Sequence, residues 1–341
     1  MKKSAFAAKS TATRPQNFSP KVPVIIKLLG TAAGGGFPQW NCGCSNCSGV
    51  RAGRIRATPR LQLQVAVSLD GVCWMLLNAS PDLRSQIEAT PELHPRGVRG
   101  TPIEGVVLTS GDLDQVLGLL LLRELTPLRI YSSASVRRIV REDNAFFHML
   151  SQNPEQSRWT DICPRQPFAP LPGLCCRAVP LGGGYPRWVP EDRGRTLNQG
   201  ESVFGLILEC TAEHTVERDT ERAGQTGGLN RIAYMPAVAQ YSDELLAELD
   251  LCDAVFVDGT FWSDDELERV DPAARSARQM GHVPLGGPGG VLEVAKQLRR
   301  PRKIFVHINN TNPILDEDSP QFAEVKSAGW EVAKDGWTLG C

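Results

Sequence analysis

Three cysteines lie within six residues of one another, in the segment Cys42-Gly43-Cys44-Ser45-Asn46-Cys47. Three thiols so close along the chain cannot all point into an apolar core from a single turn. Thiolates on a tight loop suit Zn²⁺, which favours tetrahedral coordination by sulfur and imidazole. We therefore predict a structural zinc at Cys42, Cys44 and Cys47, with a redox or iron–sulfur role as the alternative. The candidates for a fourth ligand are Cys341, His282, His307 and the Asn309–Asn310 pair.

A second group of reactive side chains follows an apolar run that ends near Thr109, in the segment Thr109-Ser110-Gly111-Asp112-Leu113-Asp114-Gln115. Two carboxylates at a junction between a strand and a helix can serve a site, or they can cap the helix N-terminus. Asp258 and His307 also follow strand-like runs, and His282 lies in a glycine-flanked turn. Loops at strand ends collect site residues in α/β proteins. The candidate site residues are therefore Asp112, Asp114, Asp258, His282 and His307.

A glycine-rich turn, residues 30–40, comes directly after the strand-like run at residues 24–29. The turn lacks the Gly-Lys-Ser/Thr of a Walker loop and the helix that follows a dinucleotide-binding GxGxxG. Glycines in such a turn allow positive φ and a close approach of the backbone to a site. We expect this turn to lie beside the site, with Phe37 and Trp40 as walls of a substrate pocket.

Strand-like and helical patterns alternate along the chain, which indicates an α/β fold. The predicted strands are 24–29, 61–69, 72–77, 103–109, 202–210, 231–235, 254–258 and 304–308, and the predicted helices are 113–125, 242–251 and 290–299. This order favours two mixed sheets between layers of helices. Residues 154–200, rich in Pro, Gly and Arg, are predicted to be a loop-dominated connection. Residues 1–21 are expected to be a disordered extension, and residues 22–341 a single domain.

Composition excludes several classes of protein. The chain has 341 residues, 41% of them hydrophobic, and no apolar run near the roughly 18 residues that a membrane span needs. A net charge of −1 argues against a nucleic-acid binder. Ten basic residues and no acidic one precede Asp70, which indicates either a solvated basic segment or a cationic wall for a carboxylate substrate. Ten cysteines without a disulfide-like distribution favour a reducing, cytoplasmic location.

Together, these motifs resemble the metallo-β-lactamase superfamily and, within it, the family of coenzyme PQQ synthesis protein B (PQQ, pyrroloquinoline quinone). The resemblance runs from about Val22 to the C-terminus and implies an αββα sandwich whose site lies where loops of both halves meet. The segments that carry it are residues 29–44, 77–82, 109–118, 258–261, 280–284 and 307–313.

The superfamily's metal motif, His-x-His-x-Asp-His, falls here on Ser110, Asp112, Asp114 and Gln115. Only Asp114 keeps the residue type of the motif. Gln115 departs from it, and a neutral amide is a weaker ligand for transition metals than imidazole. The superfamily's middle histidine has no match in the turn at residues 180–186, so a two-metal hydrolase is the least expected function.

The resemblance also implies roles for the remaining candidates. His307 matches the last metal ligand of the superfamily, His282 matches a proton-donating histidine of related tRNA-processing nucleases, and Asp258 matches a site carboxylate. The expected metal ligands are thus Asp114 and His307, holding Fe²⁺. The expected catalytic residues are Asp112, Asp258 and His282, and the expected pocket residues are Phe37, Trp40, Ser110 and Gln115.

The resemblance implies a step in PQQ biosynthesis, in which the quinone is made from a Glu-Tyr pair. We expect an Fe(II)- and O₂-dependent hydroxylase of a tyrosine-derived precursor. The alternative is a non-catalytic carrier of PQQ or its precursor toward the periplasm. The expected partners are PQQ or its precursor and other proteins of the pathway, with no nucleic acid and no membrane span. A homodimer is a candidate for the assembly state.

Overall fold

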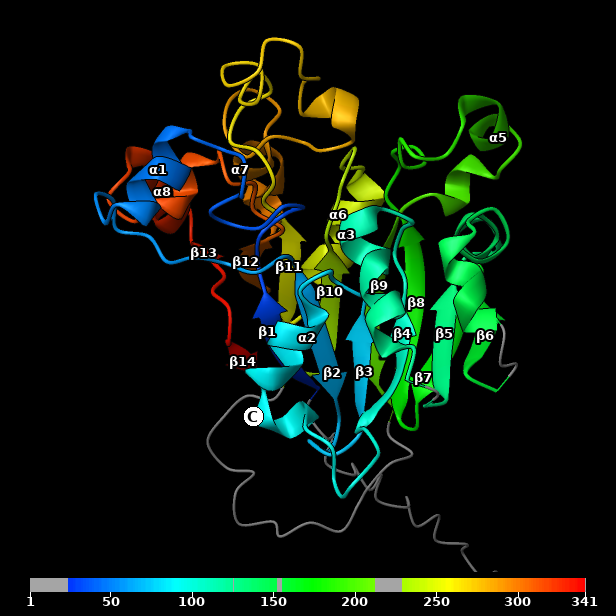
Figure 1. The fold of residues 1–341 in the computed structure, drawn as a ribbon. Coiled ribbons are helices and arrows are strands. Elements are labelled where there is room, and N and C mark those ends of the chain that lie inside the picture. The colour runs from blue at the N-terminus through cyan, green and yellow to red at the C-terminus, as the bar shows by residue number, and fades with distance from the viewer. Residues whose placement is uncertain (1–23, 125, 152–154, 212–228, 341) are drawn as a thin grey trace, which may run out of the picture.

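The computed structural model describes residues 24–124, 126–151, 155–211 and 229–340. Within these residues the strands form two seven-stranded mixed sheets that face each other (Figure 1). The first sheet, in spatial order, contains β14 (Thr338–Leu339), β1 (Ile25–Gly30), β2 (Gln64–Ser68), β3 (Trp74–Leu77), β4 (Ile103–Val107), β5 (Leu128–Ser132) and β6 (Ser157–Asp161). The second contains β13 (Trp330–Val332), β12 (Arg302–Val306), β11 (Ala254–Asp258), β10 (Arg231–Met235), β9 (Phe204–Cys210), β8 (Leu174–Pro180) and β7 (Pro167–Leu171).

Helices cover the outer face of each sheet and complete the predicted αββα sandwich (Figure 1). Buried side chains of α2, α3 and α4 pack on the first sheet, and those of α6, α7 and α8 pack on the second. The α-helices are α1 (Ser45–Arg51), α2 (Leu83–Glu88), α3 (Leu113–Val116), α4 (Ala134–Arg137), α5 (Glu191–Arg195), α6 (Asp243–Asp250), α7 (Val291–Val294) and α8 (Pro320–Ser327).

The inner core lies between the two sheets and follows the period of two that strands impose. Ile26 and Leu28 of β1 point inward together with Leu206 and Leu208 of β9, and Phe256 of β11 joins them. All five side chains are almost completely buried. Because burial of one such side chain stabilises a fold by roughly 1.5–3 kcal/mol, this shared layer fixes the position of one sheet against the other.

The prediction of a loop-dominated connection at residues 154–200 is wrong. The stretch contains β6, β7, β8 and α5. β6 and β7 are the edge strands of their sheets, and an edge strand accommodates proline because one of its sides makes no ladder hydrogen bonds. Pro167 and Pro170 lie in β7, so the residues that suggested a loop are those that an edge strand tolerates.

The predicted helix at residues 113–125 is shorter than expected. It consists of α3 and a 3₁₀ segment, η2 (Leu117–Leu122). Gly118 lies where the helix changes from α to 3₁₀. A Cβ at this position would lie 2.4 Å from the carbonyl oxygen of Ser80, so the absence of a side chain lets the chain pack directly against the loop after β3. The predicted helix at residues 290–299 is likewise divided into α7 and the 3₁₀ segment η8 (Ala295–Gln297).

Two predictions lie outside the described residues: the disordered extension at residues 1–21 and Cys341 as a zinc ligand. Within the described residues, no helix has the length and hydropathy to cross a bilayer.

Candidate functional site

The candidate site lies where the ends of strands from both sheets meet. β4 leads into the segment with Asp112 and Asp114, β11 ends at Asp258, and β12 is followed directly by His307. The glycine-rich turn is fixed beside this edge, because Ala33 N–H donates to Ile308 O at 2.9 Å and Ile308 N–H donates to Thr31 O at 3.0 Å. Gly35 and Gly36 have φ values of 92° and 70°, the positive values predicted for this turn.

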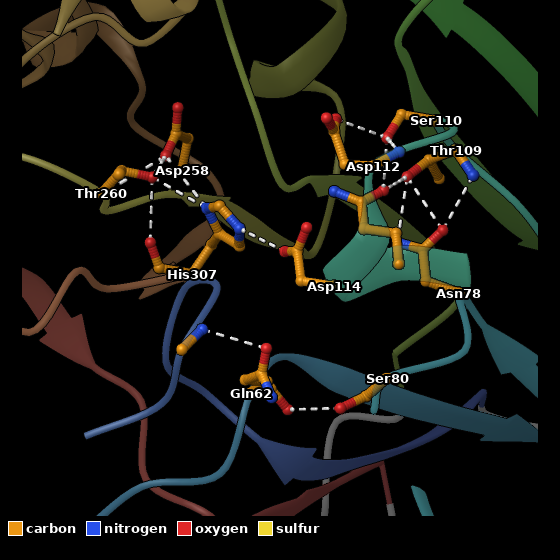
Figure 2. A network of polar contacts seen from close by, with 12 residues as sticks. Gln62, Asn78, Ser80, Thr109, Ser110, Asp112, Asp114, Asp258, Thr260 and His307 are labelled. Carbon is orange, nitrogen blue, oxygen red and sulfur yellow. Dashed lines mark hydrogen bonds and ion pairs between the residues drawn. The ribbon is translucent and has the colours of Figure 1, made fainter. Parts of the chain in front are cut away.

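His307 is the centre of the arrangement (Figure 2). Its backbone has φ +55°, a left-handed conformation that is uncommon outside glycine and often marks a functional position. Its Nδ1 lies 2.8 Å from Thr260 Oγ1, and its Nε2 lies 3.2 Å from Asp114 Oδ2. Thr260 Oγ1 is also 2.5 Å from Asp258 Oδ1, so the single hydroxyl proton goes to the carboxylate and His307 Nδ1–H donates to Thr260.

This proton assignment leaves two acceptors facing each other. With the proton on Nδ1, the lone pair of His307 Nε2 faces the Asp114 carboxylate, and a proton or a metal ion is needed between them. Two ligands with bonds of about 2.0–2.1 Å to one ion lie roughly 3 Å apart, which matches the observed 3.2 Å. Thr260 then has the role typical of a residue that fixes the tautomer of a metal-binding histidine. The residues present therefore fit a metal ion.

Asp258 and His282 form a second pair beside the first. His282 Nδ1 lies 2.7 Å from Asp258 Oδ2, which also accepts the Val238 N–H. Together with the N–H and O–H of Thr260, four hydrogen bonds fill the acceptor capacity of this carboxylate. Burial would raise the pKa of Asp258, but the charge and hydrogen bond of His282 outweigh burial and lower it. Burial opposes a proton on His282, yet Asp258 raises its pKa.

The nitrogen and oxygen atoms of this group are close enough to surround one ion. One atom each of Asp258, His282 and His307 lies within 4.8 Å of the others. The two imidazole rings are stacked with centroids 5.7 Å apart. The Tyr241 hydroxyl is buried and has no hydrogen-bond partner among the described residues, and burial followed by the charge of Asp258 raises its pKa.

A buried hydrogen-bond network occupies the other side of Asp114 (Figure 2). Thr109 Oγ1 lies 2.8 Å from Gln115 Oε1 and 3.0 Å from Asn78 Nδ2. Ser110 Oγ lies 3.1 Å from the same Gln115 oxygen and 2.8 Å from Asp112 Oδ2. The side-chain oxygen of Gln115 is thus held by Thr109 and Ser110. It is turned toward these hydroxyls and away from a metal-binding role.

Asp112 is the least acidic carboxyl of the site. Burial and the negative charge of Asp114 raise its pKa to about 6, against the lowering effect of the hydrogen bond from Ser110. The alternative role of these carboxylates as helix caps is not seen at Asp112, whose side chain makes no capping hydrogen bond to α3. Their charges are therefore available to the site.

The three cysteines form a separate cluster. The Sγ atoms of Cys42, Cys44 and Cys47 lie within 4.8 Å of one another, and α1 begins between them, with Cys44 Sγ accepting from Cys47 N–H at 3.5 Å. Burial raises the pKa of Cys44 to about 11, whereas hydrogen bonds to Cys42 overcome its burial and lower its pKa. Three thiolates repel one another unless a cation compensates them, and Zn²⁺ provides that compensation.

Asn310 approaches this cluster from the second sheet. Its side-chain nitrogen lies 3.2 Å from Cys42 Sγ, 3.3 Å from Cys47 Sγ and 3.7 Å from Cys44 Sγ. Among the fourth ligands considered from the sequence, His282 and His307 belong to the other cluster, and Asn310 is the residue that the fold brings to the sulfurs.

Some predicted contacts differ in the structure. Phe37 is 2% exposed and packs in the core, whereas Trp40 is 86% exposed. Neither ring lines the site here, because the turn buries one and directs the other to solvent, and their role in substrate binding stays a prediction. Three of the ten basic residues considered for a cationic wall make structural contacts instead. Arg51 binds the carbonyl groups of residues 39 and 42, Arg56 pairs with the acidic residues 317 and 318, and Arg60 is buried against the carbonyl of residue 333.

The sequence interpretation missed Thr260 and Tyr241. Thr260 lies two residues after Asp258 in a segment already singled out, so its position could have been recognised as that of a supporting hydroxyl. Tyr241 has no such signal, because the loop after β10 brings it to Asp258 only in three dimensions.

Comparisons with known proteins agree with this geometry. Residues 73–308 match the family model of the β-lactamase superfamily domain. Coenzyme PQQ synthesis protein B of Methylobacterium sp. (strain 4-46) is 40% identical over 313 residues, which cover 92% of this chain and 98% of the relative. The protein of the same name from Pseudomonas putida (strain W619) is 41% identical over 327 residues, 93% of this chain and 99% of the relative. The chain belongs to the coenzyme PQQ synthesis protein B family.

A solved structure supports both the family and the fold. The crystal structure of Zn(2+)-bound PqqB from Methylobacterium extorquens superimposes with a TM-score of 0.82 at 39% identity, covering 93% of this chain and all of that one. The resemblance deduced from the motifs, the αββα sandwich and the assignment to PQQ biosynthesis are therefore confirmed. The roles of the individual site residues in this member of the PqqB family stay predictions.

Proposed function

We propose that this protein is an Fe(II)- and O₂-dependent hydroxylase that acts on a tyrosine-derived precursor in PQQ biosynthesis. The observation that carries the proposal is the Asp114–His307 pair, two acceptors 3.2 Å apart with the second nitrogen of the histidine held by Thr260. Fe(II) centres that use oxygen typically combine two histidines and one carboxylate and leave further positions open, and Asp114 and His307 supply the carboxylate and one imidazole of such a set. Membership of the PqqB family places the reaction in PQQ biosynthesis.

Asp114 and His307 are the proposed metal ligands. Fe(II), when bound, supplies the activation of O₂ that an organic side chain cannot provide. Asp258 holds Nδ1–H of His282, so the free Nε2 is the atom that can give or take a proton during the reaction. The raised pKa of His282 favours its protonated form. Ser110 and Asp112 line the opposite wall, where their hydroxyl and carboxyl groups can orient the substrate.

The cysteine cluster is proposed to hold a structural zinc. Cys42, Cys44 and Cys47 supply three sulfurs, and the side-chain oxygen of Asn310 supplies the fourth ligand. The nitrogen and oxygen of an amide are distinguished by their hydrogen-bond partners, and rotation of the Asn310 amide places oxygen where nitrogen now faces the sulfurs. The Zn²⁺ of the PqqB structure from Methylobacterium extorquens supports a resident zinc in this family.

Metal analysis of anaerobically purified protein, before and after Fe(II) loading, tests both sites. We expect one tight zinc that is lost in Cys44→Ser and kept in Cys163→Ser, which changes an exposed cysteine. We expect one iron that is lost in Asp114→Ala and kept in Asp192→Ala, which changes an exposed aspartate. Oxygen consumption and ring hydroxylation by the loaded protein then test the reaction. Zinc without iron under every loading condition contradicts the hydroxylase.

A carrier of PQQ or its precursor is the second candidate, and Gln115 favours it. Its amide replaces the imidazole of the superfamily motif, and its oxygen is already held by Thr109 and Ser110. A carrier binds the quinone without turnover and with the Asp114–His307 pair free of metal. Tight binding of PQQ by protein that contains zinc but no iron would therefore support the carrier over the enzyme.

A further inference from the structure

Two arginines lie on different loops that border the candidate site. Arg187 lies in the loop between β8 and α5, and Arg275 lies in the long segment between β11 and His282. The two loops touch, because a Cβ added to Gly281 would lie 3.5 Å from the Cα of Gly183. Both arginine side chains are exposed.

The loop of Arg187 is fixed to the segment that carries Ser110 and Asp112. Trp188 Nε1–H donates to the carbonyl oxygen of Gly111 at 3.2 Å, and the ring of Pro186 lies 3.6 Å from where a Cβ of Gly111 would stand. Gly111 separates Ser110 from Asp112 along the chain. The residues on both sides of Arg187 therefore hold it at the edge of the site.

The loop of Arg275 is fixed to His282 in a similar way. His282 N–H donates to the carbonyl oxygen of Ala277 at 3.0 Å, and Met280 N–H donates to that of Ser276 at 3.1 Å. These bonds close a tight turn between Arg275 and His282. Arg275 thus stands at the mouth of the site, on the side of the proton-carrying imidazole.

Neither guanidinium group has an acidic partner among the residues that the structure describes. In the described part of the chain, Arg187 and Arg275 form no ion pair and no side-chain hydrogen bond, whereas most arginines of the second sheet and its loops pair with an acid. The acid closest to Arg275 along the loop, Asp271, accepts from the backbone N–H of Ala273. Burial and the positive charge of Arg187 lower the pKa of Arg275, a direction that agrees with the contact between the two loops.

We propose that Arg187 and Arg275 form a clamp that binds carboxylate groups of the substrate at the mouth of the Asp114–His307 site. Two guanidinium forks match carboxylates in a bidentate manner and bind them through charge-assisted hydrogen bonds. The site itself carries the carboxylates of Asp112, Asp114 and Asp258, so an anionic ligand needs cations at the entrance to overcome their repulsion. The ligand class is a small molecule with two or more carboxylates. The clamp rests on the proposed function, because that proposal defines where the ligand reacts.

Binding of PQQ, an aromatic tricarboxylate, to the full-length protein tests the clamp by titration calorimetry. The trimethyl ester of PQQ serves as a probe without the negative charges. We expect Arg187→Ala and Arg275→Ala each to weaken PQQ binding about tenfold or more, the range of a charge-assisted hydrogen bond, and to leave binding of the ester unchanged. The control is the double variant Arg96→Ala/Arg99→Ala, which removes two exposed arginines from the loop before β4, at the opposite end of that strand from Ser110.

Three results would overturn the clamp: absence of PQQ binding by the unaltered protein, equal affinity in the clamp variants, or an equal loss in the control variant. Iron content is measured in the same samples. Iron at the site with PQQ affinity that does not depend on the two arginines refutes the clamp and leaves the hydroxylase standing. PQQ binding that depends on the arginines in a chain that never holds iron refutes the hydroxylase and leaves the clamp standing.

Discussion

The cysteine cluster and the Asp114–His307 centre are neighbours built in opposite ways. His307 and Asn310 are three residues apart, so both centres share one segment after β12. The cysteine cluster takes its three sulfurs from one six-residue loop. The other centre takes Asp114 from the first sheet, and Asp258, His282 and His307 from three segments of the second. The sulfur cluster is therefore local in sequence, whereas the other centre depends on the whole sandwich.

The two centres also differ in how their charges are balanced. In the Asp114–His307 centre, Asp258 already has histidine and hydroxyl partners and Asp112 accepts from Ser110, so these carboxylates are satisfied by polar protein groups. The sulfurs have backbone N–H groups and the Asn310 amide as partners, and no cationic side chain among the described residues is hydrogen-bonded to them. Loss of metal should therefore damage the fold at the cysteines and only the chemistry at the histidines. Three experiments test this contrast.

The largest effect is expected for Cys44→Ser. Loss of a structural metal removes binding free energy from the folded state, and we expect the free energy of unfolding to fall by more than about 4 kcal/mol, the range typical of such losses. Urea unfolding and zinc content measure the effect. Cys163→Ser should change stability by less than about 0.5 kcal/mol. Equal stability of the two variants would show that the cysteines are not a structural metal site.

A smaller effect is expected for Glu266→Gln. Glu266 joins the two centres, since its carboxylate accepts from Thr311, next to Asn310, and from the backbone of Trp262, two residues after Thr260. Burial raises its pKa from 4.5 to about 7. Because the folded state favours the protonated carboxyl, the contribution to stability is complete below pH 4.5 and is lost as the pH rises through 7.

Between pH 4.5 and pH 8, the free energy of unfolding of the unaltered protein should therefore fall by about 2–3 kcal/mol relative to that of Glu266→Gln. Urea unfolding across this range measures the difference. Glu268→Gln, which changes an exposed glutamate, is the control and should follow the unaltered protein. Parallel curves for the unaltered protein and Glu266→Gln would mean that Glu266 is ionised at neutral pH in the folded state.

The smallest effect is expected for Gln115→His. An imidazole is a better ligand than an amide, and we expect Fe(II) or Zn²⁺ to bind the Asp114–His307 centre about tenfold more tightly, equivalent to about 1.4 kcal/mol. Competition with a chelator measures the affinity, and zinc at the cysteines should be unchanged. Unchanged metal affinity of the Asp114–His307 centre would indicate that residue 115 lies outside the coordination sphere of that metal ion.

Local patterns were enough to predict most of the fold, because strand periodicity and strand-end motifs are properties of short segments. The strand 254–258 and the histidine after β12 illustrate this. The edge strands β6 and β7 were missed because their prolines and arginines resemble those of loops. Asn310 at the sulfurs, Tyr241 at Asp258 and the two clamp arginines depend on contacts between distant segments, and no local pattern encodes such contacts.

The separation of Asp114 and His307 by 193 residues also sets an order of assembly. The cysteine loop can capture zinc while most of the chain is still unfolded, since its sulfurs are neighbours in sequence. The carboxylate and imidazole meet only after the two sheets have docked, and such long-range contacts form late and slowly. Zinc uptake should precede iron uptake during refolding. Iron binding would then report the completed native state, and a translation product that ends before β12 would bind zinc weakly and iron not at all.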